Sequence, residues 1–235
     1  MLIVCSLFAM LAVAPAPVDT LRPGHRALER LTLRPSLDTV DVTLVSGTTK
    51  RPLVQTVTSI TETTLGHTAA FLVTFVNASP RGAAWDSVWV DRKSFTPLRH
   101  EAGAPGNELH VRREGDRYVG TAVDSGKTTP VNTTFAQPLL DFSVLTIVAG
   151  YLPLAPGYRT WLAAWDFAQG NERIVSVQVI GEESIAGTGK AWKVQLDFGT
   201  HSVTSWYSDR SRLMVRGSVA MGSRGEMQME ARHGT

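Results

Sequence analysis

From Leu37 onward, apolar and polar residues alternate with a period of two, and turn-forming residues recur at short intervals. Val40, Val42 and Leu44 fall on one side of an extended chain, with polar residues between them, until Gly47 ends the run. Such alternation is typical of strands with one face on a core, and closely spaced turns favour antiparallel hairpins. The pattern predicts strands in the segments 52–61, 68–77, 85–91, 95–103, 108–113, 117–124 and 126–135, with further strands after residue 157.

Residues 138–151 depart from this alternation, because their apolar side chains would cover the whole circumference of a helix. Pro138 stands just before the apolar run 139–148, and Gly150 stands just after it. Proline and glycine at these places are typical of the two ends of a helix. We therefore predict a short buried helix here, packed into the core.

About a dozen short strands around a single helix, with no alternation of strands and helices, argue against a parallel sheet. An antiparallel sheet of that size must curl. We therefore predict a mainly β protein, a single curled antiparallel sheet (half-barrel) with one internal apolar helix in its concavity. No internal repeat or linker follows Pro35, so residues 37–235 are predicted to form one domain.

The N-terminal residues 1–18 carry no charged side chain and end in small residues and prolines. This pattern predicts a signal peptide, and hence export to the periplasm or the extracellular space. A short membrane anchor and an artefact of the gene start are the alternatives. Residues 19–36 are predicted to be a basic linker or a short helix. Its arginines, spaced four apart, would share one helix face: Arg22, Arg26, Arg30 and Arg34.

The charges are nearly balanced, with 23 basic and 21 acidic residues and a net charge of +2. This balance gives no electrostatic reason to expect a nucleic acid partner. The one cysteine, Cys5, lies in the predicted signal peptide, so the mature chain has no internal disulfide and no cysteine-rich metal site. The longest later apolar run, 139–154, is interrupted by Asp141, Gly150 and Pro153, so we expect no stable membrane span in the mature protein.

Two motifs invite a chemical interpretation, and neither meets the requirements of the chemistry. Residues 124–128, Asp-Ser-Gly-Lys-Thr, end like a phosphate-binding loop, but the glycine spacing is wrong and no helix follows, so we predict a hairpin turn. His100 and His110 stand on opposite arms of one hairpin, with Glu101 and Glu108 nearby. A metal needs at least three converging ligands, so we interpret these side chains as solvated. We predict no metal site and no cofactor.

The chain offers no glycine-flanked nucleophilic serine, and its one cysteine is outside the mature body. We therefore name no catalytic residue. A hydrolase would require a serine, a histidine and an acid brought together by the fold alone.

Six tryptophans are the remaining unusual feature, and two pairs of them are spaced four apart on predicted strands. Aromatic side chains on one sheet face can line an apolar ligand cavity or fill the hollow of a curved sheet, and the pattern leaves both open. The residues that we predict to face the hollow and contact an apolar ligand are Trp89, Phe142, Trp161, Trp165 and Trp192.

A set of short segments carries a family resemblance: 86–91 and 96–100, 152–157, 179–183 and 189–194, and 205–209 followed by Arg212-Leu213. In this order, over residues 85–215, they resemble the bacterial envelope proteins of domain of unknown function 3108. Those proteins in turn look like the lipoprotein carriers and sorting proteins of the periplasm, which curl an antiparallel sheet around an apolar hollow capped by helices. The resemblance implies an architecture and an envelope location, and no active site.

The sequence therefore favours an exported, non-enzymatic envelope protein that holds a lipid or another apolar molecule in the hollow of its sheet. The alternative is a structural or assembly module that binds another envelope protein, with its hollow packed solid. A hydrolase is the third reading. Cavity volume discriminates the first two, because an empty apolar space of several hundred cubic ångströms favours a ligand.

Overall fold

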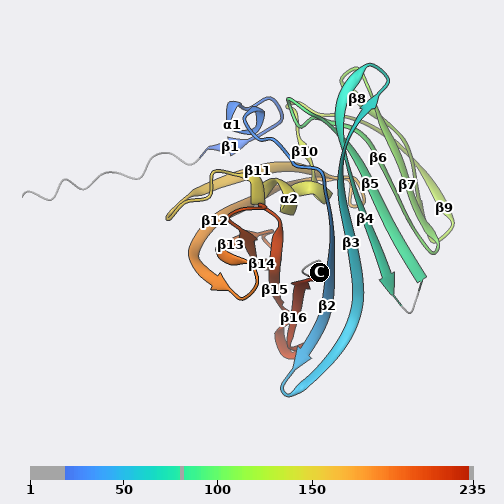
Figure 1. The fold of residues 1–235 in the computed structure, drawn as a ribbon. Coiled ribbons are helices and arrows are strands. Elements are labelled where there is room, and N and C mark those ends of the chain that lie inside the picture. The colour runs from blue at the N-terminus through green and yellow to red at the C-terminus, as the bar shows by residue number, and fades with distance from the viewer. Residues whose placement is uncertain (1–18, 80–81, 233–235) are drawn as a thin grey trace, which may run out of the picture.

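The computed structural model describes residues 19–79 and 82–232, and their elements are labelled in Figure 1. The strands are β1 (Thr20–Leu21), β2 (Ser36–Ser46), β3 (Thr49–Leu65), β4 (Thr68–Ser79), β5 (Gly82–Asp91), β6 (Pro97–Ala104), β7 (Asn107–Glu114), β8 (Arg117–Asp124), β9 (Lys127–Thr134), β10 (Leu140–Asp141), β11 (Arg159–Asp166), β12 (Asn171–Ile185), β13 (Gly189–Asp197), β14 (Ser202–Ser208), β15 (Met214–Ala220) and β16 (Glu226–Ala231). The helices are α1 (Arg26–Glu29) and α2 (Leu145–Tyr151), with 3-10 turns η1 (Phe142–Val144) and η2 (Gly222–Arg224). The predicted signal peptide, residues 1–18, lies outside the described residues.

All sixteen described strands belong to one sheet. Two antiparallel meanders, β2 to β9 and β11 to β16, are joined where β16 pairs with β2, so the C-terminal strand lies beside the first long strand (Figure 1). At the other edge the short strands β1 and β10 pair with β11, and these two pairings are parallel. The predicted antiparallel sheet is confirmed, with these two short parallel additions.

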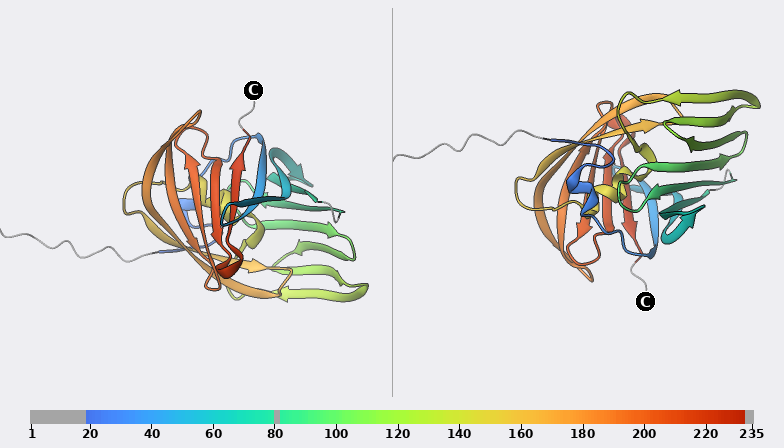
Figure 2. Two further views of the ribbon diagram at one scale, coloured as in Figure 1. Left: turned by 90° about the horizontal axis from the view of Figure 1, so that it is seen from below. Right: turned by 90° about the horizontal axis from the view of Figure 1, so that it is seen from above.

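The sheet curls without closing, and α2 lies on its concave side, as the two views of Figure 2 show. Register shifts interrupt the pairing at four places, between Val42 and Thr43 for example, and again between Trp206 and Tyr207. Such irregularities increase the local twist of a strand and help a long sheet to bend. The strands β6 to β9 extend to one side of the curled part (Figure 2).

The main core lies between the concave face of the sheet and α2. The fully buried α2 residues Leu145 and Ala149 pack there with Phe71 of β4, Val194 of β13 and other apolar strand residues. Burying an aliphatic side chain of this size contributes about 2 kcal/mol, so the inward positions of the strands are the main source of stability.

The helix is shorter than the sequence predicts. The expected helix over residues 138–151 begins only at Leu145, because Leu140 and Asp141 pair with β11 as β10. The Asp141 carboxylate then accepts a hydrogen bond from the backbone N–H of Ser143, at 2.9 Å, and this cap starts η1. A capping side chain at this point sets the start of the helical turns, and apolar periodicity does not reveal it.

The segment predicted to be a basic linker or a short helix packs on the body of the protein. Leu21, Leu28 and Leu33 are buried in the main core, and α1 spans only four residues. A helix of one turn cannot display the four arginines as one stripe. Arg22 instead pairs with Glu172 at 3.1 Å, and the guanidinium of Arg34 donates to a backbone carbonyl of residue 210.

Among residues 19–79 and 82–232, no helix has the length and apolar character needed to cross a bilayer.

Candidate functional site

A large cavity lies inside the curl of the sheet. This space, called the main cavity below, measures about 680 Å³ and lies between α2 and the concave faces of β2, β3, β14, β15 and β16. Apolar residues that line it include Val42, Val203, Val219, Met227, Met229 and Ile147. Cavities of this size and character are typical of small-molecule sites.

Four methionines line the main cavity: Met214, Met221, Met227 and Met229. An unbranched thioether chain adapts its shape to irregular neighbours, so such a wall accommodates apolar ligands of different shapes. Gly217 makes room for two of these side chains. A Cβ atom at Gly217 would lie 2.7 Å from Cε of Met229 and 3.3 Å from Sδ of Met214.

The helix α2 covers one end of the main cavity and is tied to the sheet through Tyr207. The Tyr207 hydroxyl donates a hydrogen bond to the carbonyl oxygen of Thr146 at 2.7 Å, and burial raises the pKa of Tyr207. Gly150 permits the close contact, because a Cβ atom there would overlap the carbonyl oxygen of Arg212 and the ring of Tyr207. Ile147 and the other cavity-facing residues of α2 leave the main cavity open beside them.

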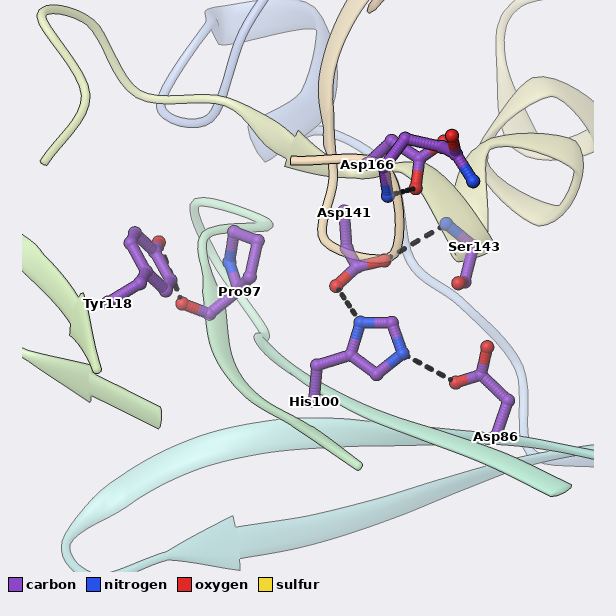
Figure 3. Close-up of polar contacts among 8 residues, drawn as sticks. Asp86, Pro97, His100, Tyr118, Asp141, Ser143 and Asp166 are labelled. Atoms are coloured by element: carbon purple, nitrogen blue, oxygen red, sulfur yellow. Dashed lines mark hydrogen bonds and ion pairs between the residues drawn. The ribbon is translucent and has the colours of Figure 1, made fainter. Parts of the chain in front are cut away.

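A second candidate site is a buried imidazole between two carboxylates (Figure 3). His100 of β6 is 5% exposed; its Nδ1 lies 2.8 Å from Oδ2 of Asp141, and its Nε2 lies 3.0 Å from Oδ1 of Asp86. Burial by itself would lower the pKa of His100, but the charge and hydrogen bond of Asp141, together with Asp86, overcome this and raise it to about 10. His100 is therefore an imidazolium at neutral pH.

The His100 ion pairs link three distant parts of the chain, since Asp86 lies on β5 and Asp141 on β10. An imidazolium with carboxylates on both ring nitrogens has no lone pair with which to accept a proton, so it is not poised as a general base. These side chains also border the second cavity, called the hairpin cavity, of about 520 Å³ beneath β6 to β8. We interpret them as an electrostatic clamp between the hairpins and the segment before α2.

The two histidines of the β6–β7 hairpin do not face each other, and one of them is not solvated as predicted. In the register of β6 and β7, His110 faces Glu101, whereas His100 faces Val111. The two imidazoles are therefore on opposite faces of the hairpin, because neighbouring positions on a strand alternate. His110 is 47% exposed and has Glu101 and Glu108 within 3.7 Å, whereas His100 is buried and not solvated as expected.

One signal in the sequence could have revealed the clamp. Asp141 is the lone charged residue within the apolar run 139–148, and a buried carboxylate needs a partner. The sequence could not tell which residue supplies it, because His100 is 41 positions away.

None of the five aromatic residues predicted to contact a ligand lines the main cavity. Trp192 comes nearest to the expectation, since it packs in the main core and donates a hydrogen bond from Nε1 to Asp209 at 2.7 Å. Phe142 borders the hairpin cavity and contacts Phe198, with ring centroids 5.5 Å apart.

The other three lie on the sheet face opposite the main core. Trp89 alternates with the buried Val88 and Val90 of β5, and the guanidinium of Arg99 lies 5.2 Å from its ring. Trp161 and Trp165 alternate with buried core residues of β11 in the same way.

Trp165 joins a smaller apolar cluster between β11 and the hairpins. Its ring centroid lies 4.7 Å from that of Phe135, and the cluster also holds Tyr118 and Phe167. The structure thus brings Trp165 together with aromatic residues of the hairpins and not with the other four predicted contacts.

The remaining motif is the turn at residues 124–128. Asp124 pairs with Lys127 across the β8–β9 turn, and Ser125 and Gly126 both have positive φ values. The prediction of a hairpin turn is confirmed. Among residues 19–79 and 82–232, no group of three or more histidine, cysteine, aspartate or glutamate side chains is placed to hold a metal ion.

Comparison with known proteins places this chain in a family. Residues 42–230, from within β2 to within β16, match the family model described as "Protein of unknown function (DUF3108)". The chain belongs to the DUF3108 family. The family resemblance inferred from the sequence is thereby confirmed, while the likeness to periplasmic lipoprotein carriers stays a prediction.

One solved structure has a similar fold: the crystal structure of a beta-barrel-like protein of domain of unknown function DUF1849 from Brucella abortus. The TM-score is 0.53 at 11% sequence identity, over 86% of this DUF3108 chain and 97% of the other. At this identity the likeness shows the fold alone. No curated protein sequence matches the chain significantly.

Proposed function

We propose that this DUF3108 protein is a non-enzymatic binding protein that holds a lipid or another apolar molecule in the main cavity. The observation that supports this proposal best is the cavity itself, a space of about 680 Å³ with a largely apolar wall inside a curved sheet. Site volumes of about 300–1,000 Å³ are usual for small-molecule ligands.

Hydrophobic burial would supply the affinity. About ten methylene groups transferred from water into such a wall contribute roughly 8 kcal/mol, against an association cost of about 4–15 kcal/mol. A flexible acyl chain of about ten methylene groups is therefore near the minimum length that binds. The methionines on β15 and β16 favour a site that tolerates different chain lengths.

The alternative, a structural module with its hollow packed solid, accounts less well for the main cavity. The helix α2 lies on the concave side, yet its side chains line the cavity without filling it. A serine hydrolase built on His100 would need this imidazole to accept a proton, and the buried His100 carries its proton at neutral pH between two carboxylates.

The cellular location is part of this proposal. An apolar segment at residues 1–18 favours export to the periplasm or the extracellular space. A curled sheet with an apolar hollow would suit the transport or storage of a lipid there, in line with the predicted likeness of the family to periplasmic lipoprotein carriers.

Displacement of an environment-sensitive dye tests the proposal, combined with solvent extraction of the purified protein. We expect extracts to contain lipid, and we expect dye fluorescence to rise with the protein and to fall when a fatty acid is added. Extracts without lipid, together with no dye response, would contradict the proposal.

A matched pair of variants on β16 locates the site. Met229 lines the main cavity, whereas the next residue towards the N-terminus, Gln228, lies on the other face of the sheet. Met229→Trp should abolish most of the dye response, and Gln228→Trp should leave it unchanged. Both proteins must unfold cooperatively, and an equal loss in the two would argue against this location.

A further inference from the structure

The main cavity has a polar corner next to α2, and two of its polar atoms have no hydrogen-bond partner among the described residues. These atoms are Oγ of Ser205 and Nη1 of Arg212, and both are buried. The Ser205 hydroxyl lies close to that of Tyr207 without forming a hydrogen bond of normal geometry. A buried donor that lacks an acceptor destabilises the fold, and more so when it is charged.

The two atoms lie at the same end of the cavity. Tyr207 follows Ser205 by two positions on β14 and therefore points to the same side of the sheet. Gly150 of α2 is in close contact with both the ring of Tyr207 and the backbone of Arg212. The corner is thus built by β14, α2 and the turn after β14.

Arg212 is held in place by its turn. Its backbone has a φ of 64°, a left-handed conformation that is uncommon outside glycine, and its N–H donates to the carbonyl oxygen of Ser208 at 3.0 Å. Its Nη2 lies 3.9 Å from Oδ1 of Asp209, which already accepts the hydrogen bond of Trp192. The Arg212 side chain is nevertheless 31% exposed and lines the main cavity, so its guanidinium is within reach of a ligand there.

The charged groups around the main cavity favour an anion. Arg212 and Arg224 both line it, and so does His201. Asp38 of β2 also lines it, where its Oδ1 accepts a hydrogen bond from the backbone N–H of Thr39 at 2.9 Å. Two guanidinium groups against one carboxylate leave the polar lining with a positive balance.

We propose that the ligand is an amphiphile with a single acyl chain and an anionic head group, a carboxylate or a phosphate, that accepts a hydrogen bond from the guanidinium of Arg212. The acyl chain runs along the wall formed by Met227 and Met229. This inference rests on the proposed function, since it specifies the class of apolar molecule that enters the main cavity.

Dye displacement by a series of amphiphiles with the same sixteen-carbon chain tests the head group, using the mature protein. The series comprises palmitate, a palmitoyl lysophosphatidate, hexadecanol and hexadecyltrimethylammonium. An ionic hydrogen bond to a partly buried guanidinium is worth about ten- to a hundredfold in affinity, so we expect the two anions to bind tighter than hexadecanol by about that factor. The order of palmitate and lysophosphatidate tells carboxylate from phosphate.

Variants at two neighbouring arginines separate head-group recognition from folding. Arg212→Gln should lose the preference for anions and keep its affinity for hexadecanol, and Arg212→Lys should keep part of the preference. Arg210→Gln is the matched control, because Arg210 is exposed in the same turn and does not line the cavity. The hexadecanol affinity reports whether the site is still folded.

The outcomes distinguish the two proposals. If hexadecanol binds the unaltered protein as tightly as palmitate, or if the cationic amphiphile binds best, the inference is wrong and the apolar site stands. If Arg212→Gln weakens hexadecanol and palmitate equally, Arg212 is structural and the inference is also wrong. If no member of the series displaces the dye, the proposed function itself fails.

Discussion

Replacing His100 by glutamine should remove a contribution to stability that depends on pH. The folded protein holds the His100 proton up to a pKa of about 10, whereas the ordinary value is 6.5. Because the folded-state pKa is raised, the stabilisation is fully present below the unfolded pKa and is lost as the pH rises towards about 10. The window of interest is therefore alkaline.

The size of the effect follows from the proton balance. Between the two pKa values the folded protein binds one more proton than the unfolded chain, so the free energy of unfolding falls by up to about 1.4 kcal/mol per pH unit. From about pH 7 to about pH 9 the unaltered protein should lose roughly 2–3 kcal/mol through this group. The variant should lack this slope and be less stable near neutrality by about 3–5 kcal/mol, because removing the imidazolium leaves the buried Asp141 carboxylate unpaired.

Urea unfolding curves at several pH values measure these quantities. His110→Gln is the matched control, because His110 stands on the other face of the same hairpin with half of its side chain exposed, and exposed ion pairs contribute little. If the His100 variant and the unaltered protein lose stability in parallel between neutral and alkaline pH, the buried imidazolium is not present and the reasoning fails.

Three further substitutions test the packing that surrounds the main cavity. Gly150→Ala should destabilise the protein by about 1–3 kcal/mol in urea unfolding, because the new Cβ atom would lie 2.6 Å from Cδ1 of Tyr207. Gly181→Ala is the control and should change the stability little, because a Cβ atom there meets nothing within 4 Å. Leu28→Ala should lower the free energy of unfolding by about 2–5 kcal/mol, since α1 inserts this residue into the main core. If the stability lost is no larger than that lost in Arg30→Ala, at an exposed position, the segment does not contribute to the core. Tyr207→Phe should lower the free energy of unfolding by about 1 kcal/mol and speed the exchange of amide hydrogens in α2, because the hydrogen bond to Thr146 is lost. Unchanged exchange would contradict the role of this bond.

The strands were predictable because they are encoded locally. Alternation identifies a strand that is buried on one face, and the turn residues between neighbouring strands make antiparallel pairing nearly obligatory. Residues 124–128 show this well, since the glycine spacing and the lack of a following helix excluded a phosphate-binding loop and indicated the turn that the structure contains. The parallel pairings of β1 and β10 with β11 were not predictable, because each joins segments that no short turn connects.

The residues of the candidate site were harder to predict from the sequence than the strands. Alternation places Trp89 on one side of β5 and Val88 and Val90 on the other, but it does not tell which side becomes concave. Large aromatic residues were assumed to fill the hollow, whereas the valines face it and Trp89 packs against Arg99 on the outside. The methionines near the C-terminus were the better signal, because Met227 and Met229 alternate on β16 and line the cavity.

Long-range polar contacts were hidden for a different reason. The partners of His100 come from β5 and β10, and only the folded sheet brings them together. The same is true of Arg212, whose position depends on the contact between its turn and Gly150 of α2.

A crystal structure of the protein grown with a fatty acid that carries bromine at its chain end tests the central claim most directly. The account predicts an anomalous bromine peak inside the main cavity, between α2 and the wall that Val203 and Met227 form. A peak in the hairpin cavity or on the convex face near Trp89, or the absence of a peak from crystals of a protein that binds the fatty acid in solution, would contradict it.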